Sequence, residues 1–152
     1  MKVRDIMTQP PQTCRLETDL ATASRRMKEN MCGTLAVLDK RGRVVGMVTD
    51  RDLAMSLGET THPPAYIRVE EVMSASVHSC SPDEDVRRAL ARMAAFRLRR
   101  LPVVNSDGDV KGVLSIDDVI LWGVDSHGIS ANELASALRS ICAPQAALLE
   151  PA

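Results

Sequence analysis

Two stretches of the chain carry apolar residues at the three- and four-residue spacing of an amphipathic helix. The two sets are Leu20, Ala23, Met27 and Met31, and then Val86, Ala89, Leu90 and Met93. Side chains at this spacing share one face of a helix, so each stretch predicts a helix with one buried face. Residues 81–84, Ser-Pro-Asp-Glu, predict the N-cap and acidic first turn of the second helix.

Each predicted helix is followed by two short apolar runs. The runs are residues 35–38 and 44–48 in the first half of the chain, and residues 101–104 and 110–114 in the second half. A polar turn that contains glycine separates the two runs of each pair. This pattern predicts two β-hairpins, each of which leads into a further helix that begins near Asp50 or Ile116.

The two halves of the chain align with each other without a gap. A shift of 66 residues places residues 5–53 on residues 71–119. The matched pairs include Asp5-Ile6-Met7-Thr8 with Glu71-Val72-Met73-Ser74, Ala23 with Ala89, Arg26 with Arg92, Met27 with Met93, Val37 with Val103, Gly42 with Gly108, and Gly46 with Gly112. A shared register of this length indicates a duplicated unit that runs strand, helix, strand, strand, helix.

Proline and glycine positions set the predicted boundaries. Residues 1–58 form the first unit, a connector with paired prolines covers residues 59–68, and residues 69–124 form the second unit. Residues 125–152 are expected to hold a final helix and a frayed tail. This helix opens with Ser130 and Glu133 as a capping box, carries Leu134, Leu138 and Ile141, and is limited by Pro144.

Composition narrows the class of function. The 152 residues include 19 Lys and Arg against 20 Asp and Glu, and only 2% are aromatic, so neither a basic field nor stacking platforms favour nucleic-acid binding. No apolar run approaches the roughly 18 residues of a membrane helix, and the start of the chain lacks the apolar stretch of a signal peptide. We therefore expect a cytoplasmic protein without a membrane partner, whose four scattered cysteines are free thiols.

The junction between each hairpin and its following helix repeats a G-x-x-[ST]-x-x-D pattern. Gly46, Thr49 and Asp52 carry it in the first unit, and Gly112, Ser115 and Asp118 carry it in the second. A hydroxyl at a helix start lies beside free backbone N–H groups that suit an anion, and a carboxylate three residues later can accept both hydroxyls of a ribose. The same spacing also serves as a capping box that needs no ligand, so both interpretations stand.

The tandem repeat, the Asp-Ile-Met-Thr and Glu-Val-Met-Ser openings, residues 101–105 (Leu-Pro-Val-Val-Asn) and the two junctions resemble a pair of cystathionine β-synthase (CBS) domains, which together form a Bateman module. The resemblance covers about residues 2–123. It implies an α+β fold of two β-α-β-β-α units related by a pseudo-two-fold axis, to which this chain adds a short C-terminal helix. It also implies two clefts between the units for AMP, ADP, ATP or S-adenosylmethionine.

The resemblance assigns roles to individual residues. Asp52 and Asp118 would bind ribose, and Thr49 and Ser115 would lie near the phosphate. Backbone near Thr13-Cys14 and Ser79-Cys80 would lie near adenine.

The two clefts are expected to differ in charge. The second unit has Arg99, Arg100 and Pro102 where members of the family often direct a basic pair at phosphate, while the first unit has Gly33-Thr34. Paired charge-assisted bonds from arginine favour a phosphorylated ligand in the second cleft, although a solvated charged face that includes Arg97 is the alternative. Asp50 and Asp117 add negative charge near either cleft, which leaves the cation S-adenosylmethionine as a ligand for the first.

We predict neither catalytic residues nor a metal site nor a catalytic cofactor, because the three histidines are dispersed and no nucleophile or phosphate-loop motif is present. The expected function is a ligand-sensing regulatory module, similar to small bacterial CBS proteins of the hypoxic-response and stress type, that signals through an oligomer or an unknown effector protein. A dimerising scaffold with empty clefts and a thiol-based redox sensor are the alternatives. Cys14 and Cys80 are expected to pack as small apolar groups, unless Cys142 folds back on one of them.

A homodimer is expected from apolar residues on the helices of both units. These residues are Leu53, Met55, Leu57, Ala91, Met93, Ala94 and Ala95.

Overall fold

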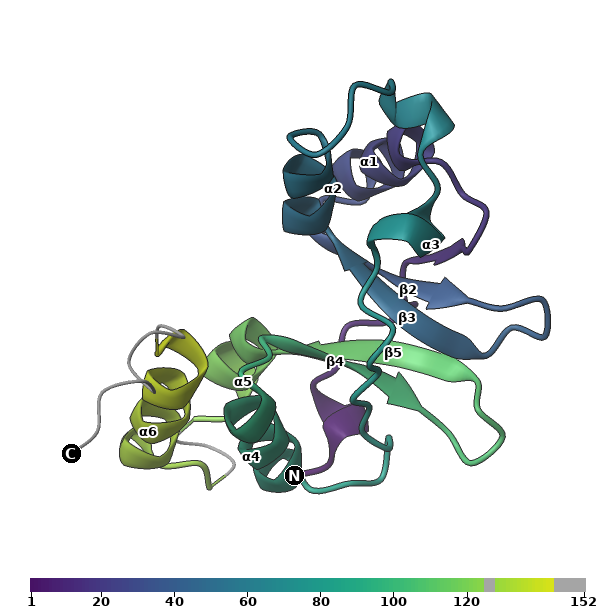
Figure 1. The fold of residues 1–152 in the computed structure, drawn as a ribbon. Coiled ribbons are helices and arrows are strands. Elements are labelled where there is room, and N and C mark those ends of the chain that lie inside the picture. The colour runs from purple at the N-terminus through teal and green to yellow at the C-terminus, as the bar shows by residue number, and fades with distance from the viewer. Residues whose placement is uncertain (125–127, 144–152) are drawn as a thin grey trace. The chain divides into compact units, whose positions relative to one another are not determined.

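The computed structural model describes residues 1–124 and 128–143, which form short strands and helices in an α+β arrangement (Figure 1). The strands are β1 (Thr13–Arg15), β2 (Thr34–Leu38), β3 (Val44–Thr49), β4 (Arg100–Val104) and β5 (Val110–Ser115). The α-helices are α1 (Leu20–Glu29), α2 (Asp50–Ser56), α3 (Val69–Val72), α4 (Val86–Phe96), α5 (Ile116–Trp122) and α6 (Ala131–Cys142). Two 3₁₀ turns are η1 (Val3–Asp5) and η2 (Pro64–Tyr66). The order confirms the expected α+β fold class. A strand, helix, hairpin and helix follow one another in the first repeat, and a helix, hairpin and helix follow one another in the second, before the final helix.

The chain divides into two compact units, and each unit borrows a segment from the opposite repeat. One unit, called here the α4–α6 unit, contains residues 1–9, 78–103 and the described residues from 113 onward. The other, the α1–α3 unit, contains residues 10–77 and 104–112. The opening segment of the first repeat therefore packs with the second repeat, and the opening segment of the second repeat packs with the first.

Matching backbone bridges hold both exchanged segments. Thr8 pairs with Val113 in the α4–α6 unit, and Ser74 pairs with Met47 in the α1–α3 unit. These pairs are related by the same shift of 66 residues that aligns the sequence. A Cβ atom on Gly46 would lie 2.5 Å from the Met73 sulfur and 3.0 Å from the Ser74 carbonyl oxygen, so the exchanged segment packs closely against this glycine. The glycine of the repeated pattern thus has a packing role at position 46.

In the α1–α3 unit, a three-stranded sheet supports two helices. β1 runs parallel to β2, and β2 pairs antiparallel with β3. α1 begins at its N-cap Asp19, whose carboxylate accepts the Thr22 backbone N–H at 2.8 Å. The core of this unit consists of Cys14, Leu20, Ala23, Met27, Leu35, Val37, Val48, Leu53, Ile67 and Val69. The predicted helix face from Leu20 to Met27 is therefore buried.

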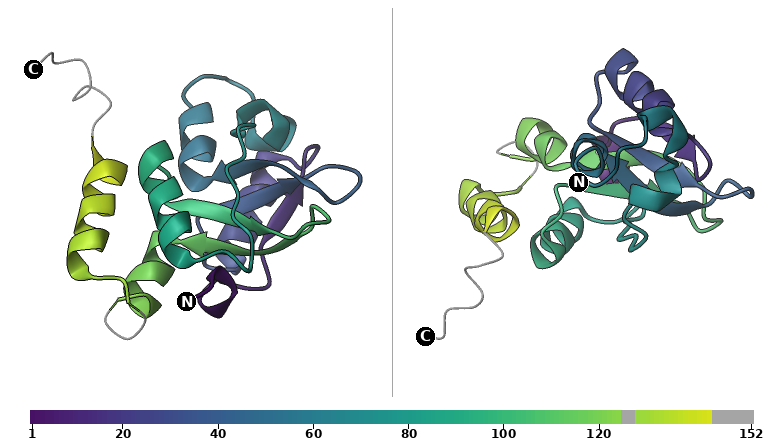
Figure 2. Two further views of the ribbon diagram at one scale, coloured as in Figure 1. Left: turned by 90° about the horizontal axis from the view of Figure 1, so that it is seen from below. Right: turned by 45° about the horizontal axis from the view of Figure 1, so that its top comes forward.

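In the α4–α6 unit, the first strand of the repeat is reduced to a single bridge, in which Cys80 pairs parallel with Val103. Val103 belongs to β4, which pairs with β5 in a two-stranded sheet. The core contains the exchanged residues Val3 and Ile6, the predicted α4 face, and apolar side chains of α6. α6 lies alongside α4 in the views of Figures 1 and 2, and the two helices are in contact.

Three local predictions are wrong. Asp85, and not Ser81, is the N-cap of α4, because residues 81–84 form a turn in which the Glu84 N–H donates to the Ser81 carbonyl. Met31 lies beyond the end of α1 at φ 47° and is 95% exposed. Met93 and Leu53, expected on an exposed dimer face, are core residues.

The capping box of the final helix is confirmed: Ser130 accepts the Glu133 N–H at 3.2 Å, and the Glu133 carboxylate accepts the Ser130 N–H at 2.8 Å. The expected role of Pro144 and the frayed tail lie outside the described residues. Within residues 1–124 and 128–143, none of the helices has the length and apolar character that crossing a bilayer requires.

Candidate functional site

The hydroxyl and carboxylate of each repeated junction are joined in a capping box. In the first repeat, the Thr49 N–H and hydroxyl donate to Asp52 Oδ2 at 2.8 and 2.7 Å, and the Asp52 N–H donates back to the hydroxyl at 3.2 Å. Ser115 and Asp118 repeat these contacts, both at 2.7 Å, with a return bond of 3.1 Å. The cap therefore occupies one carboxylate oxygen and leaves the lone pairs of Oδ1 for another donor. The capping and ligand-binding interpretations are thus compatible.

Thr8 adds a third group to the second junction. Its hydroxyl donates to Asp118 Oδ1 at 3.3 Å, which places a side chain of the exchanged opening segment against the predicted ribose-binding carboxylate. Sequence reasoning did not single out this residue. The signal was present in the repeat, because Thr8 aligns with the hydroxyl residue Ser74.

Arg99 and Arg100 line a pocket of about 240 Å³, which we call the arginine pocket. Its other lining residues are Ile116, Asp117, Ile120, Leu138 and Cys142. Arg100 is half-buried at the start of β4, and the Arg99 carbonyl accepts the Ile116 N–H at 2.9 Å. This bond ties the arginine pair to the first turn of α5, which also carries Asp118. The wall made by α6 was not predicted, because nothing in a local sequence pattern indicates which groove a separate helix will cover.

The corresponding position in the first repeat has no arginine. Thr34, which aligns with Arg100, is buried and donates its hydroxyl to the Val48 carbonyl at 3.1 Å. A Cβ atom on Gly33 would lie 2.9 Å from an Asp50 carboxylate oxygen, so this carboxylate occupies the space beside Gly33. The place of Arg99 and Arg100 is therefore taken in the first repeat by Gly33 and Thr34, with the Asp50 carboxylate beside the glycine.

The expected adenine-contacting segments are held by a matching pair of arginines. Arg26 donates to the Thr13 carbonyl at 2.9 Å, and Arg92 donates to the Ser79 carbonyl at 2.7 Å. The Cys80 N–H donates to the carbonyl of the buried Pro102 at 3.1 Å. The Thr13 and Ser79 carbonyls each accept one hydrogen bond in this way and keep a second lone pair for another donor.

The cysteines at these segments lie in apolar surroundings. Cys14 is 2% exposed, and its burial raises the pKa of the thiol from 9.0 to about 11 despite the opposing charge of Arg26. Burial, reinforced by the negative charge of Glu84, raises the pKa of Cys80 to about 12. Both thiols are therefore protonated at neutral pH, which disfavours nucleophilic redox chemistry. Cys142 instead lies against Arg99, with its sulfur 3.9 Å from Nη2.

The remaining candidates do not assemble into a metal centre. Within residues 1–124 and 128–143, no group of three or more His, Cys, Asp or Glu side chains is placed to hold a metal ion. His78 stacks on Phe96 with ring centroids 3.7 Å apart. His78 is the histidine nearest to Cys80 in the sequence, and this stacking contact gives it a packing role.

The family model of the CBS domain matches residues 3–59 and 69–125, which together contain both junctions. The chain belongs to the CBS domain family. A relative from Acidianus ambivalens, an uncharacterized 17.7 kDa protein in the bps2 3′ region, is 34% identical over 128 residues. That match covers 83% of this chain and 75% of the relative. The two CBS repeats thus account for both the sequence duplication and the paired junctions.

Two solved structures show the same fold. One is the CBS domain pair of protein MJ0100, in complex with 5′-methylthioadenosine and S-adenosyl-L-methionine. It is 26% identical to this chain in sequence, with a TM-score of 0.73, and the match covers 81% of this chain and 96% of the MJ0100 chain. Hypoxic Response Protein I, with two coordinated zinc ions, has a TM-score of 0.72 and 22% identity, covering 80% and 98% of the two chains. At that lower identity, the likeness concerns the CBS-pair fold alone.

Proposed function

We propose that this chain is a non-catalytic sensor that binds an adenosine-containing nucleotide at the second CBS repeat, with its phosphate at Arg99 and Arg100. The observation that carries the proposal is the arginine pocket beside the Ser115–Asp118 cap. Two guanidinium groups outnumber the single Asp117 carboxylate in the pocket lining, so an anionic group is favoured there. The ribose hydroxyls would donate to Asp118 Oδ1, beside Thr8.

For the first repeat, we propose a ligand without phosphate, such as S-adenosylmethionine. Asp50 occupies the space beside Gly33, where the second repeat has an arginine, and a carboxylate there favours a cation over a phosphate. Asp52 would bind the ribose, and Thr49 would hold its carboxylate in place as the Ser115 hydroxyl does for Asp118. The adenosine ligands of the related MJ0100 pair support this class of compound.

The output of such a sensor would pass through an oligomer or a separate effector protein. Free thiols at all four cysteines suit a reducing cytoplasm, where we place this activity. The redox-sensor alternative is weakened by the raised pKa values of Cys14 and Cys80. The scaffold alternative predicts a folded chain that binds no adenosine compound at all.

Calorimetry with AMP and adenosine on wild type and Arg100→Ala tests the phosphate assignment. If Arg100 contributes a charge-assisted bond worth about 1.5 to 3 kcal/mol, its loss weakens AMP binding by roughly ten-fold to over a hundred-fold. Adenosine binding should change little. Arg139→Ala, at an exposed position of α6 outside the pocket lining, is the matched control and should retain both affinities.

Equal losses for AMP and adenosine would show that Arg100 shapes the pocket without contacting phosphate. Unchanged affinity for both compounds would make the arginine pair a solvated surface. Nucleotide binding that survives in the double variant Asp52→Ala, Asp118→Ala would overturn the ribose assignment. Absence of binding by the wild-type chain to AMP, ADP, ATP and S-adenosylmethionine would favour the scaffold.

A further inference from the structure

The arginine pocket has a wall that lies outside both CBS repeats. The family model ends at residue 125, whereas Leu138 and Cys142 line the pocket from α6. These two residues are four apart, so they lie on the same face of the helix. Leu138 is half-buried and Cys142 is exposed. The helix that this chain adds to its CBS pair therefore takes part in the pocket at Arg99 and Arg100.

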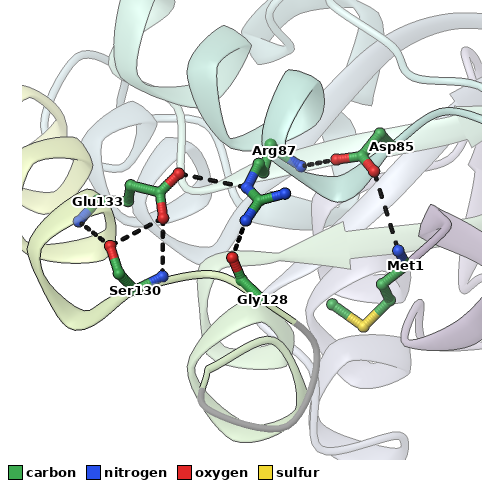
Figure 3. A network of polar contacts seen from close by, with 6 residues as sticks. All are labelled: Met1, Asp85, Arg87, Gly128, Ser130 and Glu133. Carbon is green, nitrogen blue, oxygen red and sulfur yellow. Dashed lines mark hydrogen bonds and ion pairs between the residues drawn. The ribbon is translucent and has the colours of Figure 1, made fainter.

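Packing and polar contacts hold α6 in this place. Three of its apolar side chains are less than 10% exposed in the core of the α4–α6 unit: Leu134, Ala137 and Ile141. Arg87 of α4 forms an ion pair with Glu133 of α6 at 3.2 Å, and it donates a hydrogen bond to the Gly128 carbonyl before the helix (Figure 3). Because close-packed core side chains hold an element in position, α6 is a built wall of the pocket.

The end of α6 brings negative potential to the pocket. Cys142 is the last residue of the helix, and the last carbonyl groups of an α-helix have no partner within the helix. Their aligned dipoles give this end a partial negative charge. The Arg99 guanidinium lies against it, with Nη2 3.9 Å from the Cys142 sulfur. One of the two arginines thus already offsets the helix end before a ligand is bound.

The charges of the lining match a single phosphate group. Arg99 and Arg100 are the cations among the lining residues, and Asp117, in the first turn of α5, is the anion. A phosphate monoester carries about −1.5 to −2 charges at pH 7, which two guanidinium groups balance. Each further phosphate adds negative charge beside Asp117 and the end of α6. The described lining supplies no third cation to compensate for that charge.

The size of the pocket agrees with this charge balance. Its volume of about 240 Å³ lies below the roughly 300 to 1,000 Å³ of sites that enclose a whole drug-sized ligand. The pocket therefore suits one end of a nucleotide whose ribose lies at Asp118.

We propose that α6 makes the second repeat selective for a nucleoside monophosphate over a di- or triphosphate. This selectivity rests on the nucleotide site proposed above and names the class of ligand that the site takes. Leu138 and Cys142 occupy space into which a longer phosphate chain would extend, and the helix end repels the charge of that chain. Asp117 adds to the repulsion from α5. Occupancy of the second repeat then follows the monophosphate while the triphosphate is rejected.

Calorimetry with adenosine, AMP, ADP and ATP on the full chain, in buffer without divalent cations, tests the selectivity. The wild type should bind AMP at least about ten-fold more tightly than ATP, because like charges placed together weaken binding. Cys142→Lys adds a third cation to the lining, so ATP should gain more affinity than AMP and the preference should shrink by about ten-fold. Cys142→Asp should weaken both nucleotides, and ATP more than AMP. Adenosine has no phosphate and should bind all three proteins alike.

Ser140→Lys is the matched control. Ser140 lies two residues before Cys142 on α6, is exposed and is not among the lining residues, so the variant adds the same charge near the same helix end. It should keep the wild-type preference for AMP. Asp117→Asn removes the carboxylate of the lining and should raise the affinity for ATP more than the affinity for AMP. All of these positions are exposed, and thermal unfolding followed by circular dichroism identifies any variant that fails to fold.

The outcomes separate this selectivity from the nucleotide site on which it rests. Equal affinity of the wild type for AMP and ATP, with both still dependent on Arg100, would overturn the selectivity and leave the nucleotide site in place. A preference for AMP that Cys142→Lys does not change would show that α6 does not set it. An equal shift in Ser140→Lys would reduce the effect to net charge and would also overturn the proposal. Absence of binding to every adenosine compound would overturn the nucleotide site itself.

Discussion

The helix pair α1–α2 and the helix pair α4–α5 descend from one duplicated pattern but have different surroundings. α4 is covered by α6, and Arg87 anchors that helix through Glu133. The aligned surface of α1 carries Ala21 in place of Arg87 and opens into a groove. Burial of the shared core face is common to both, since Ala23 and Ala89 are fully buried. The two repeats thus keep the same buried helix face toward the core, while the residues on the outer helix face differ between them.

The junctions of the two repeats diverge in the same way. Their capping boxes match within about 0.1 Å in the three hydrogen bonds, because the cap is a local backbone requirement. The adjoining residues differ, with Gly33-Thr34 in one and Arg99-Arg100 in the other. A shared cap therefore adjoins an arginine pair in one repeat and none in the other, which is a basis for selecting different ligands.

The largest effect is expected where α6 covers the second repeat. Leu134→Ala should destabilise the chain by about 2 to 5 kcal/mol, because the side chain is 9% exposed and its removal leaves a cavity. Leu57→Ala, at the open groove, should change stability by no more than about 0.5 kcal/mol in the monomer. Urea unfolding of both variants beside the wild type measures the two effects. Similar costs for the two variants would mean that the grooves are equally covered.

The aligned thiols provide a comparison that depends on pH. Their folded pKa values, about 11 for Cys14 and about 12 for Cys80, exceed the ordinary value of 9.0, so burial favours the neutral form. The stability that this preference contributes is complete below pH 9 and is lost as pH rises toward 11 and 12, because only the unfolded chain ionises readily in that window.

Iodoacetamide labelling with mass spectrometry tests the same difference in exposure. At pH 8, the exposed Cys142 should react rapidly, while the buried Cys14 and Cys80 react only as the chain unfolds. Rapid labelling of Cys14 in the folded protein would revive the redox-sensor alternative.

The smallest predicted effect concerns the ends of α1 and α4. Met31 and Arg97 occupy aligned positions with φ of 47° and 55°, in the left-handed region that costs a side-chain-bearing residue about 1 to 2 kcal/mol. Met31→Gly should therefore stabilise the chain by up to about 1 kcal/mol, since the relief of strain exceeds the added entropy of glycine in the unfolded state. Arg97→Gly should act similarly. Calorimetric melting temperatures that fall in both variants would contradict this account.

Local patterns predicted much of the fold. The faces of α1 and α4, the hairpins, and the caps at Thr49, Ser115 and Ser130 follow from helical spacing and hydrogen-bonding needs within a few residues. Errors arose where two local signals competed. Ser81 and Asp85 are both good N-cap residues. α4 begins after Asp85, with the buried Val86 as its first residue. At Met31, the spacing of apolar residues that is typical of a helix continues in the sequence beyond Glu29, the last residue of α1.

The amino-acid sequence by itself determined the duplication, the paired junctions and the charge difference between Gly33-Thr34 and Arg99-Arg100, because each of these is a property of residue type and order. Only the tertiary structure decided that Thr8 contacts Asp118 and that α6 covers α4 and walls the arginine pocket. Each of these contacts joins residues distant in the chain. Such contacts depend on which apolar surfaces meet during folding, and a local pattern carries no information about the identity of the surface it will meet.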